Sequence, residues 1–342
     1  MKSLKNILVT GGAGYIGSHT VIELIENGFN PVILDDFRNA HKSSIEGIEK
    51  IVGFEVDVRE IDVCDKAKVM AVFEEFSFEG IIHFAAYKAV GESVQSPLSY
   101  YENNLIGLIN ILQLAIDFKV ENFVFSSSCT IYGEPKNSKI VTENSPIQLA
   151  SSPYGNTKQI GEQIINDVIA SGANIKVLNL RYFNPVGAHS SSLIGELPIG
   201  KPNNLLPVVT QCAVGKISSL TVNGNDYDTI DGTCVRDYVH VLDLANAHVK
   251  GVEWLTLQKE PIVENINIGT GKGTSVLEVI ETFEEISGLK LNWKFGDRRE
   301  GDVVEIFADV SKSFKLLSWK ASRSVKDAII DSWNWELKLK DD

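Results

Sequence analysis

Tyr154 and Lys158 stand four residues apart in the run Ser152–Lys158. Positions i and i+4 share one face of a helix, so a phenol and an ammonium at this spacing lie side by side. A fixed positive charge favours the phenolate and lowers the pKa of a phenol from its usual value of about 10. The pair therefore predicts a tyrosine that acts as a base near neutral pH, although ordinary helix neighbours share this spacing.

A glycine-rich turn near the N-terminus places this pair in a redox context. Residues 7–10 are typical of a short buried strand, and a helical run follows the turn. Between them, Gly12, Gly14 and Gly17 match the pattern G-x-G-x-x-G, which allows a tight turn and the close approach of a pyrophosphate. The N-terminus of the helix then attracts the pyrophosphate. The order of strand, turn and helix predicts a dinucleotide-binding site.

Two aspartates indicate which dinucleotide this site takes. Asp35 and Asp36 follow the second apolar strand, residues 32–34, at about the distance where this fold places an acid on the ribose 2′-hydroxyl. A carboxylate accepts a hydrogen bond from that hydroxyl and repels a 2′-phosphate. The pattern therefore favours NAD over NADP.

Composition and charge are typical of a soluble enzyme. A chain of 342 residues exceeds the usual size of one domain, so a large domain with a smaller one is expected. The net charge of −13, without a block of Lys or Arg, argues against nucleic acid or an anionic membrane surface as the main partner.

The spacing of the cysteines bears on metal binding, and the length of the apolar runs bears on the cellular location of the protein. The four cysteines are scattered without a Cys-x-x-Cys pair, which indicates neither a zinc cluster nor a disulfide framework. No segment approaches the length of a transmembrane helix, and the apolar run after Met1–Lys5 is too short for a signal peptide. We therefore expect a cytoplasmic protein with reduced thiols and no metal site.

Apolar runs alternate with helical runs through the first half of the chain. Three of these runs read as buried strands: 80–86, 122–128 and 175–181. The alternation predicts an α/β fold with a Rossmann-type, doubly wound parallel sheet. Ligands bind beyond the carboxyl ends of such strands, which would bring Ala85, Ser128 and Phe183 to one crevice.

After Pro185 the composition of the sequence changes, and loops rich in Gly, Asn and Pro are expected. We therefore expect an NAD-binding Rossmann domain over residues 1–184 and a smaller, substrate-binding α/β domain over residues 185–342. No flexible linker separates the two parts, so they should pack together, with the segment at about 236–260 packing back on the first domain.

Several blocks of the sequence resemble known enzymes. The turn Thr10–Gly17, the run Phe125–Ser128 and the Tyr154/Lys158 pair are similar to the extended short-chain dehydrogenase/reductase family. More specific blocks resemble the UDP-glucose 4-epimerases within that family. These blocks are His83–Val94, Arg181–His189, Pro202–Leu205, Val235–His240 and Arg298–Asp302. The resemblance spans nearly the whole chain.

The resemblance implies a mechanism that the residue types support. Tyr154 takes the proton of the sugar 4-hydroxyl while a hydride passes from C4 to NAD, and Ser128 bridges the hydroxyl and the phenol. Lys158 holds the nicotinamide ribose. The 4-keto sugar then turns over and receives the hydride on its opposite face, so UDP-glucose and UDP-galactose interconvert. This requires a tightly anchored nucleotide and a loosely held hexose.

The resemblance also implies two sets of binding residues. The cofactor set comprises Gly11, Gly14, Tyr15, Ile16, Gly17, Asp35, Asp36, Asp62, Val63, Phe84, Ala85, Ala86, Lys88, Asn103, Ser128, Tyr154, Lys158 and Phe183. The substrate set comprises Lys88, Ser128, Tyr154, Asn184, Asn204, Leu205, Arg236, Arg299, Asp302 and Ile306. A homodimer formed through helices of the cofactor domain is a further implication.

Two other functions stay open at this point. A nucleotide-sugar 4,6-dehydratase shares the hydride step but needs an added acid/base pair beside the serine, where this chain has Cys129 and Thr130. A non-catalytic NAD-sensing protein would be expected to lack the tyrosine or the lysine, and this chain has both.

The range of sugars is also open. In the resembled family, the position of Ile306 lines the hexose pocket, where a large Tyr excludes 2-acetamido sugars and a small residue admits them. Ile306 is intermediate in size and offers no hydrogen-bond partner to a buried amide, which costs roughly 1–3 kcal/mol when unpaired. We therefore expect UDP-glucose and UDP-galactose to be preferred over UDP-N-acetylhexosamines.

Overall fold

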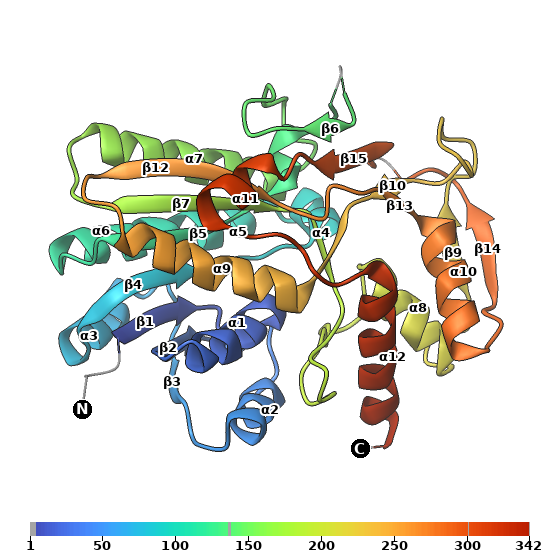
Figure 1. The fold of residues 1–342 in the computed structure, drawn as a ribbon, viewed down its shortest axis with the longest axis horizontal. Helices are drawn as coiled ribbons and strands as arrows, with labels where there is room; N and C mark the ends of the chain where they lie inside the picture. The colour runs from blue at the N-terminus through green and yellow to red at the C-terminus, as the bar shows by residue number, and fades with distance from the viewer. Residues whose placement is uncertain (1–4, 136–137, 300, 342) are drawn as a thin grey trace.

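The computed structural model describes residues 5–135, 138–299 and 301–341, so Glu300 of the Arg298–Asp302 block lies outside the described residues. Its centre is a seven-stranded sheet in which all neighbouring strands are parallel (Figure 1). In spatial order the strands are β12 (Ile262–Ile268), β7 (Lys176–Tyr182), β5 (Asn122–Ser128), β4 (Phe78–His83), β1 (Lys5–Thr10), β2 (Phe29–Asp35) and β3 (Asp57–Glu60). The predicted Rossmann-type parallel sheet is confirmed.

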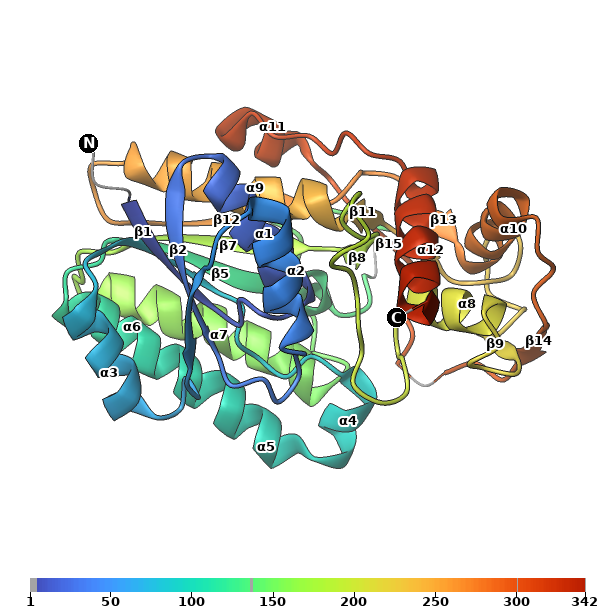
Figure 2. The same ribbon diagram turned by 90° about the horizontal axis from the view of Figure 1, so that it is seen from below.

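Helices cover both faces of this sheet, as the two views in Figures 1 and 2 show. One layer contains α1 (Tyr15–Glu26), α2 (Ser43–Val52) and α9 (Val241–Thr256), and the other contains α3 (Lys66–Glu75), α6 (Gly107–Asp117) and α7 (Pro153–Ala170). Alternation along β1 supplies both cores, because Ile7 and Val9 pack with the first layer and Leu8 packs with the second. Burial on both faces explains why the strands are continuous apolar runs.

The second half of the chain contributes to this layered body. Helix α9 packs on α1 and against β5 and β7, and β12 forms the edge of the sheet beside β7. The segment at about 236–260, which the sequence predicts to pack back on the first domain, contains α9. Strand β12, which follows it and ends at residue 268, also lies in the layered body.

A smaller lobe is built from the remaining elements. Its core lies among α8 (Leu205–Ala213), α10 (Val276–Ser287), α12 (Val325–Asp341) and the paired strands β9 (Leu220–Asn223) and β14 (Trp293–Gly296). A four-stranded sheet joins β13 (Thr274–Ser275), β10 (Val235–Arg236), β15 (Glu305–Ala308) and β6 (Ile140–Val141). Since β6 comes from the first half of the chain, this sheet ties the lobe to the larger body.

Short elements fill the connections between these bodies. Strand β8 (Asn184–Val186) pairs with β11 (Tyr238–His240). The others are α4 (Val90–Gln95), α5 (Pro97–Tyr101), the π-helix η1 (Glu102–Ile106), the 3₁₀ helix η2 (Cys129–Tyr132) and α11 (Ser311–Leu317). Within the described ranges, we find no helix with the length and apolarity needed to cross a membrane.

Helix α7 carries the Tyr154/Lys158 pair, and local signals in the sequence fix its start. The Ser152 side chain accepts a hydrogen bond from the backbone N–H of Gly155 (3.2 Å), and Pro153 occupies the first helical position. The helix then runs to Ala170, which places Tyr154 and Lys158 in its first two turns. The helical phase assumed for the pair is confirmed.

Candidate active site

The glycine turn between β1 and α1 leaves space that only glycine permits. Gly11 has a φ of 71°, and a Cβ atom there would lie 2.8 Å from the backbone N of Ala85. A Cβ at Gly17 would lie 2.2 Å from the Gly11 carbonyl oxygen. Gly14 caps α1 without a side-chain bond, so the N–H groups of the first turn, at Tyr15, Ile16 and Gly17, are available to a ligand. This cradle fits a dinucleotide pyrophosphate.

Asp35 closes the cradle at the end of β2. Its carboxylate accepts hydrogen bonds from the backbone N–H groups of Ala13 (3.0 Å) and Phe37 (2.9 Å). The acid is therefore fixed beside the glycine turn, in the position that suits a ribose hydroxyl. Burial raises the pKa of Asp35, while the two backbone bonds act in the opposite direction.

The segment after β4 forms another wall. The backbone N–H groups of Phe84 and Ala85 both donate to the Thr10 carbonyl oxygen, at 2.9 and 3.1 Å, which sets this segment against the turn. The predicted strand 80–86 thus ends at His83, because Phe84 leaves the sheet ladder. Phe84 and Ala85 thus lie beside Gly11, and Ala86 follows them in the chain.

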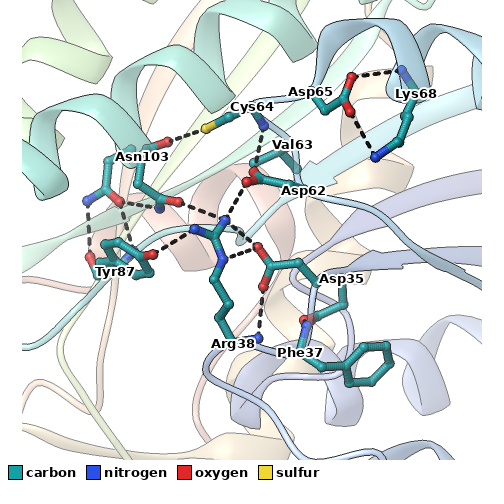
Figure 3. Close-up of polar contacts among 12 residues, drawn as sticks. Asp35, Phe37, Arg38, Asp62, Val63, Cys64, Asp65, Lys68, Tyr87 and Asn103 are labelled. Carbon is teal, nitrogen blue, oxygen red and sulfur yellow. Dashed lines mark hydrogen bonds and ion pairs between the residues drawn. The ribbon is translucent and has the colours of Figure 1, made fainter.

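Sequence reasoning missed Arg38, which contacts several of the predicted cofactor residues. Figure 3 shows its guanidinium between Asp62 and Tyr87. It forms an ion pair with Asp62 (2.7 Å) and donates to the Tyr87 hydroxyl (2.9 Å) and to Asn103 Oδ1 (3.5 Å). The same guanidinium pairs with Asp36. The spacing Asp36-x-Arg38 was the available signal, although it does not reveal the bond to Asp62.

The structure brings together the three predicted catalytic side chains, Ser128, Tyr154 and Lys158. All are buried, with exposed fractions of 6%, 9% and 4%. The Lys158 Nζ atom lies 6.0 Å from the centroid of the Tyr154 ring and donates to the carbonyl oxygen of Ser126 (2.6 Å). Ser128 Oγ accepts from the backbone N–H of Thr130 (3.2 Å), and the interaction of this hydroxyl with the phenol acts to lower the pKa of Tyr154.

The predicted lowering of the Tyr154 pKa is wrong. Burial raises the pKa of Tyr154 above its usual value, and the hydrogen bond with Ser128 offsets only part of this rise. Burial also lowers the pKa of Lys158 to about 7, with the charge of Glu162 acting in the opposite direction. Desolvation is therefore the largest influence on the pKa of both groups.

A buried ionic network, also missed from the sequence, stands behind Lys158. Arg181 forms a two-pronged pair with Glu162, with bonds of 3.0 and 2.6 Å, and Ser127 Oγ donates to the same carboxylate (2.5 Å). Glu162 follows Lys158 by four residues on α7, so this spacing was a readable signal. The network ties α7 to the ends of β5 and β7.

The predicted substrate residues fall into two groups. In one, Lys88 (3.4 Å) and Asn204 (2.5 Å) both donate to Glu196 Oε1, a residue that sequence reasoning missed. Asn204 caps α8, which begins at Leu205.

In the other group, Asp302 pairs with Arg299 (2.6 Å) and lies 3.6 Å from Arg236. Ile306 is the β15 partner of Arg236 and is buried in a cluster with Phe183. Asn184 follows Phe183 and begins β8.

Comparisons with known proteins agree with this site. The chain belongs to the NAD dependent epimerase/dehydratase family, whose model matches residues 7–269. Within that family it belongs with the UDP-glucose 4-epimerases. UDP-glucose 4-epimerase 1 of Oryza sativa subsp. japonica is 49% identical over 98% of this chain and 95% of its own length. The enzyme of Bacillus subtilis (strain 168) is 47% identical over 96% of both chains.

A solved structure shows the same likeness in three dimensions. The crystal structure of UDP-glucose 4-epimerase from Bifidobacterium longum in complex with NAD+ and UDP has a TM-score of 0.94 and 43% sequence identity. The match covers 98% of each chain.

The buried ammonium of Lys158 predicts a pH-dependent stability. Between its folded pKa of about 7 and its usual 10.5, the unfolded chain binds more protons than the folded chain. The free energy of unfolding should therefore rise with pH in this window, by at most about 1.4 kcal/mol per pH unit from this group. Lys158→Met should remove this slope in urea unfolding, whereas Lys139→Met, at an exposed lysine, should keep it. Equal slopes in wild type and Lys158→Met would contradict the assignment.

Proposed function

We infer that the chain catalyses the reversible C4 epimerisation of UDP-glucose and UDP-galactose with bound NAD. The observation that carries this inference is the buried group of Ser128, Tyr154 and Lys158 at the carboxyl edge of a parallel sheet that also holds the glycine cradle. The similarity to UDP-glucose 4-epimerases over nearly the whole chain supports the same reaction.

Tyr154, Ser128 and Lys158 have different roles in proton transfer. A nicotinamide held by Lys158 would supply the chemistry of reversible hydride transfer at C4 of the sugar. Tyr154 takes the proton of the 4-hydroxyl through its phenolate and gives it back, and Ser128 orients both hydroxyl groups. Lys158 stabilises the phenolate and binds the nicotinamide ribose. The positive charge of an oxidised nicotinamide would act against the effect of burial on the pKa of Tyr154.

The UDP moiety must stay fixed while the 4-keto hexose turns over. We assign Arg236, Arg299 and Asp302 to the nucleotide, because a pair of guanidiniums suits a diphosphate. Lys88 and Asn204 complete the anchor from the other side. Both arginines are held by one carboxylate in the structure, so their donors are positioned before substrate binds.

The same division of labour supports a two-domain description. We assign residues 1–184 to NAD binding and residues 185–342 to binding of the UDP-sugar. The separate apolar core of α8, α10 and α12 supports the second domain. We further assign the protein to the cytoplasm, because its scattered cysteines suit a reducing compartment.

A 4,6-dehydratase reaction is disfavoured by the chemistry beside Ser128. That reaction needs an added acid and base to remove water across C5 and C6 of the sugar. Cys129 stands there, and burial raises the pKa of its thiol to about 12, so it stays neutral at physiological pH. A neutral, weakly acidic thiol is a poor substitute for a carboxyl group.

The assignment of Tyr154 is tested by substitution. Tyr154→Phe should keep its fold and its NAD content but lose epimerase activity by on the order of 10²-fold or more, because a positioned acid/base is removed. Tyr101→Phe serves as a matched control, since the Tyr101 hydroxyl only accepts a bond from Asn156 (2.8 Å). Activity should be followed with UDP-glucose, together with the absorbance of reduced nicotinamide. Near-normal activity of Tyr154→Phe would remove this residue from the mechanism.

Ile306 is proposed to set the preference among sugars. Its side chain is 4% exposed and lies in the cluster that includes Phe183 and Tyr132. Wild type should show kcat/KM about tenfold or more higher for UDP-glucose than for UDP-N-acetylglucosamine, because a buried amide without a partner costs roughly 1–3 kcal/mol. Ile306→Gly should narrow this ratio, whereas Glu305→Gly, on the opposite face of β15, should not. Equal use of both sugars by wild type rules out this role.

We propose that the protein is a homodimer through an exposed apolar stripe on η1 and α6. Ile106, Ile109 and Ile116 recur at helical spacing, with exposed fractions of 41%, 48% and 37%, and Leu98 on α5 is 80% exposed. Sedimentation at micromolar concentration should give a dimer for wild type and a monomer for Ile109→Glu. Leu257→Glu, at an exposed residue beyond α9, should remain dimeric. A monomeric wild type contradicts the proposal.

A further inference from the structure

Arg38 joins several segments at one guanidinium. Its Nε donates to Asp36 Oδ2 (2.6 Å), and its Nη2 pairs with Asp62 Oδ2 (2.7 Å). Its Nη1 donates to the Tyr87 hydroxyl (2.9 Å), and its guanidinium carbon lies 5.6 Å from the centroid of that ring. Asp36 follows β2, Asp62 follows β3 and Tyr87 follows β4, so the bonds span three strand ends. Figure 3 shows the contacts of Arg38 with Asp62 and Tyr87.

The fold does not require these bonds. Strands β2 and β3 are already joined by their own ladder from Val32 to Asp35, and Ile61 continues it with a bond from its N–H to the Asp35 carbonyl oxygen (3.1 Å). The side chains of Arg38 and Asp62 are 44% and 38% exposed, and ion pairs this exposed contribute little to stability. Their position at the cofactor cleft calls for a role toward a ligand.

We propose that Arg38 retains the cofactor by fastening the loop after β2 to the loop after β3 across the adenosine half of the site. NAD then leaves only when the Arg38–Asp62 pair opens. The inference rests on the proposed function, because it requires NAD in the cleft.

The same geometry argues against a role of Arg38 in binding the 2′-phosphate of NADP. In NADP enzymes, an arginine near the end of β2 accommodates the 2′-phosphate. Here the guanidinium already serves two carboxylates, a hydroxyl and the Asn103 amide oxygen, and a third carboxylate, Asp35, stands beside them. The excess of negative charge selects a dinucleotide without a 2′-phosphate.

The test compares the release of bound NAD from the holoenzyme in wild type, Arg38→Ala and Arg59→Ala. Arg59 is a matched control, because it also pairs with two carboxylates, Asp57 (3.8 Å) and Glu75 (2.6 Å), and lies over an aromatic ring, Phe76. Release is followed by exchange against labelled NAD, at low and at raised salt, and thermal unfolding is recorded in parallel.

We expect NAD release from Arg38→Ala to be at least about tenfold faster than from wild type. Salt should accelerate release from wild type but not from Arg38→Ala, because salt screens an exposed ion pair. Arg59→Ala should release NAD at the wild-type rate. Unchanged release from Arg38→Ala, or equal acceleration in Arg59→Ala, overturns the proposal.

Binding of NADP to wild type and Arg38→Ala provides a separate test. If wild type binds NADP as tightly as NAD, and Arg38→Ala loses NADP selectively, then Arg38 is a 2′-phosphate site and the inference is wrong. A wild-type protein that binds neither dinucleotide overturns the proposed function itself, and the inference with it.

Discussion

The exclusion of water from Lys158 is the constraint on which the active site depends. An ammonium in a dry setting is costly unless its donors are satisfied, and here the carbonyl oxygen of Ser126 takes one of them. The nearby charge of Glu162 partly compensates the rest. Burial lowers the pKa of Lys158 to about 7, so the charged form of this lysine depends on these partners.

The end of β5 shows how the sheet serves this constraint. Three consecutive serines are each used differently, since Ser126 bonds Tyr182, Ser127 bonds Glu162 and Ser128 faces the Tyr154 phenol. Alternation along a strand sends neighbouring side chains to opposite faces, so one short run can anchor both the chemistry and its support. The supporting pair of Glu162 and Arg181 then fixes α7, which carries the phenol.

Local features could be predicted from the sequence, and partners distant in the chain could not. The turn after β1 and the spacing of Tyr154 and Lys158 are set by neighbouring residues, so their patterns are readable. The bonds of Arg38 depend on which strand ends lie side by side, and no local pattern contains that information. The predicted direction of the Tyr154 pKa shift is wrong for a related reason. Desolvation depends on how deeply the residue is buried in the folded protein, which the local sequence does not show.

The place of β12 at the edge of the large sheet has a consequence for synthesis of the chain. Strand β7 is complete at residue 182, but its outer partner ends only at residue 268, after α8, β9 and β10 of the smaller lobe have been made. Until then β7 has an open edge, which is a template for pairing with other chains. Helix α9, which covers α1, also arrives late. The nascent chain therefore passes through a period of exposure to aggregation that ends when both late elements dock.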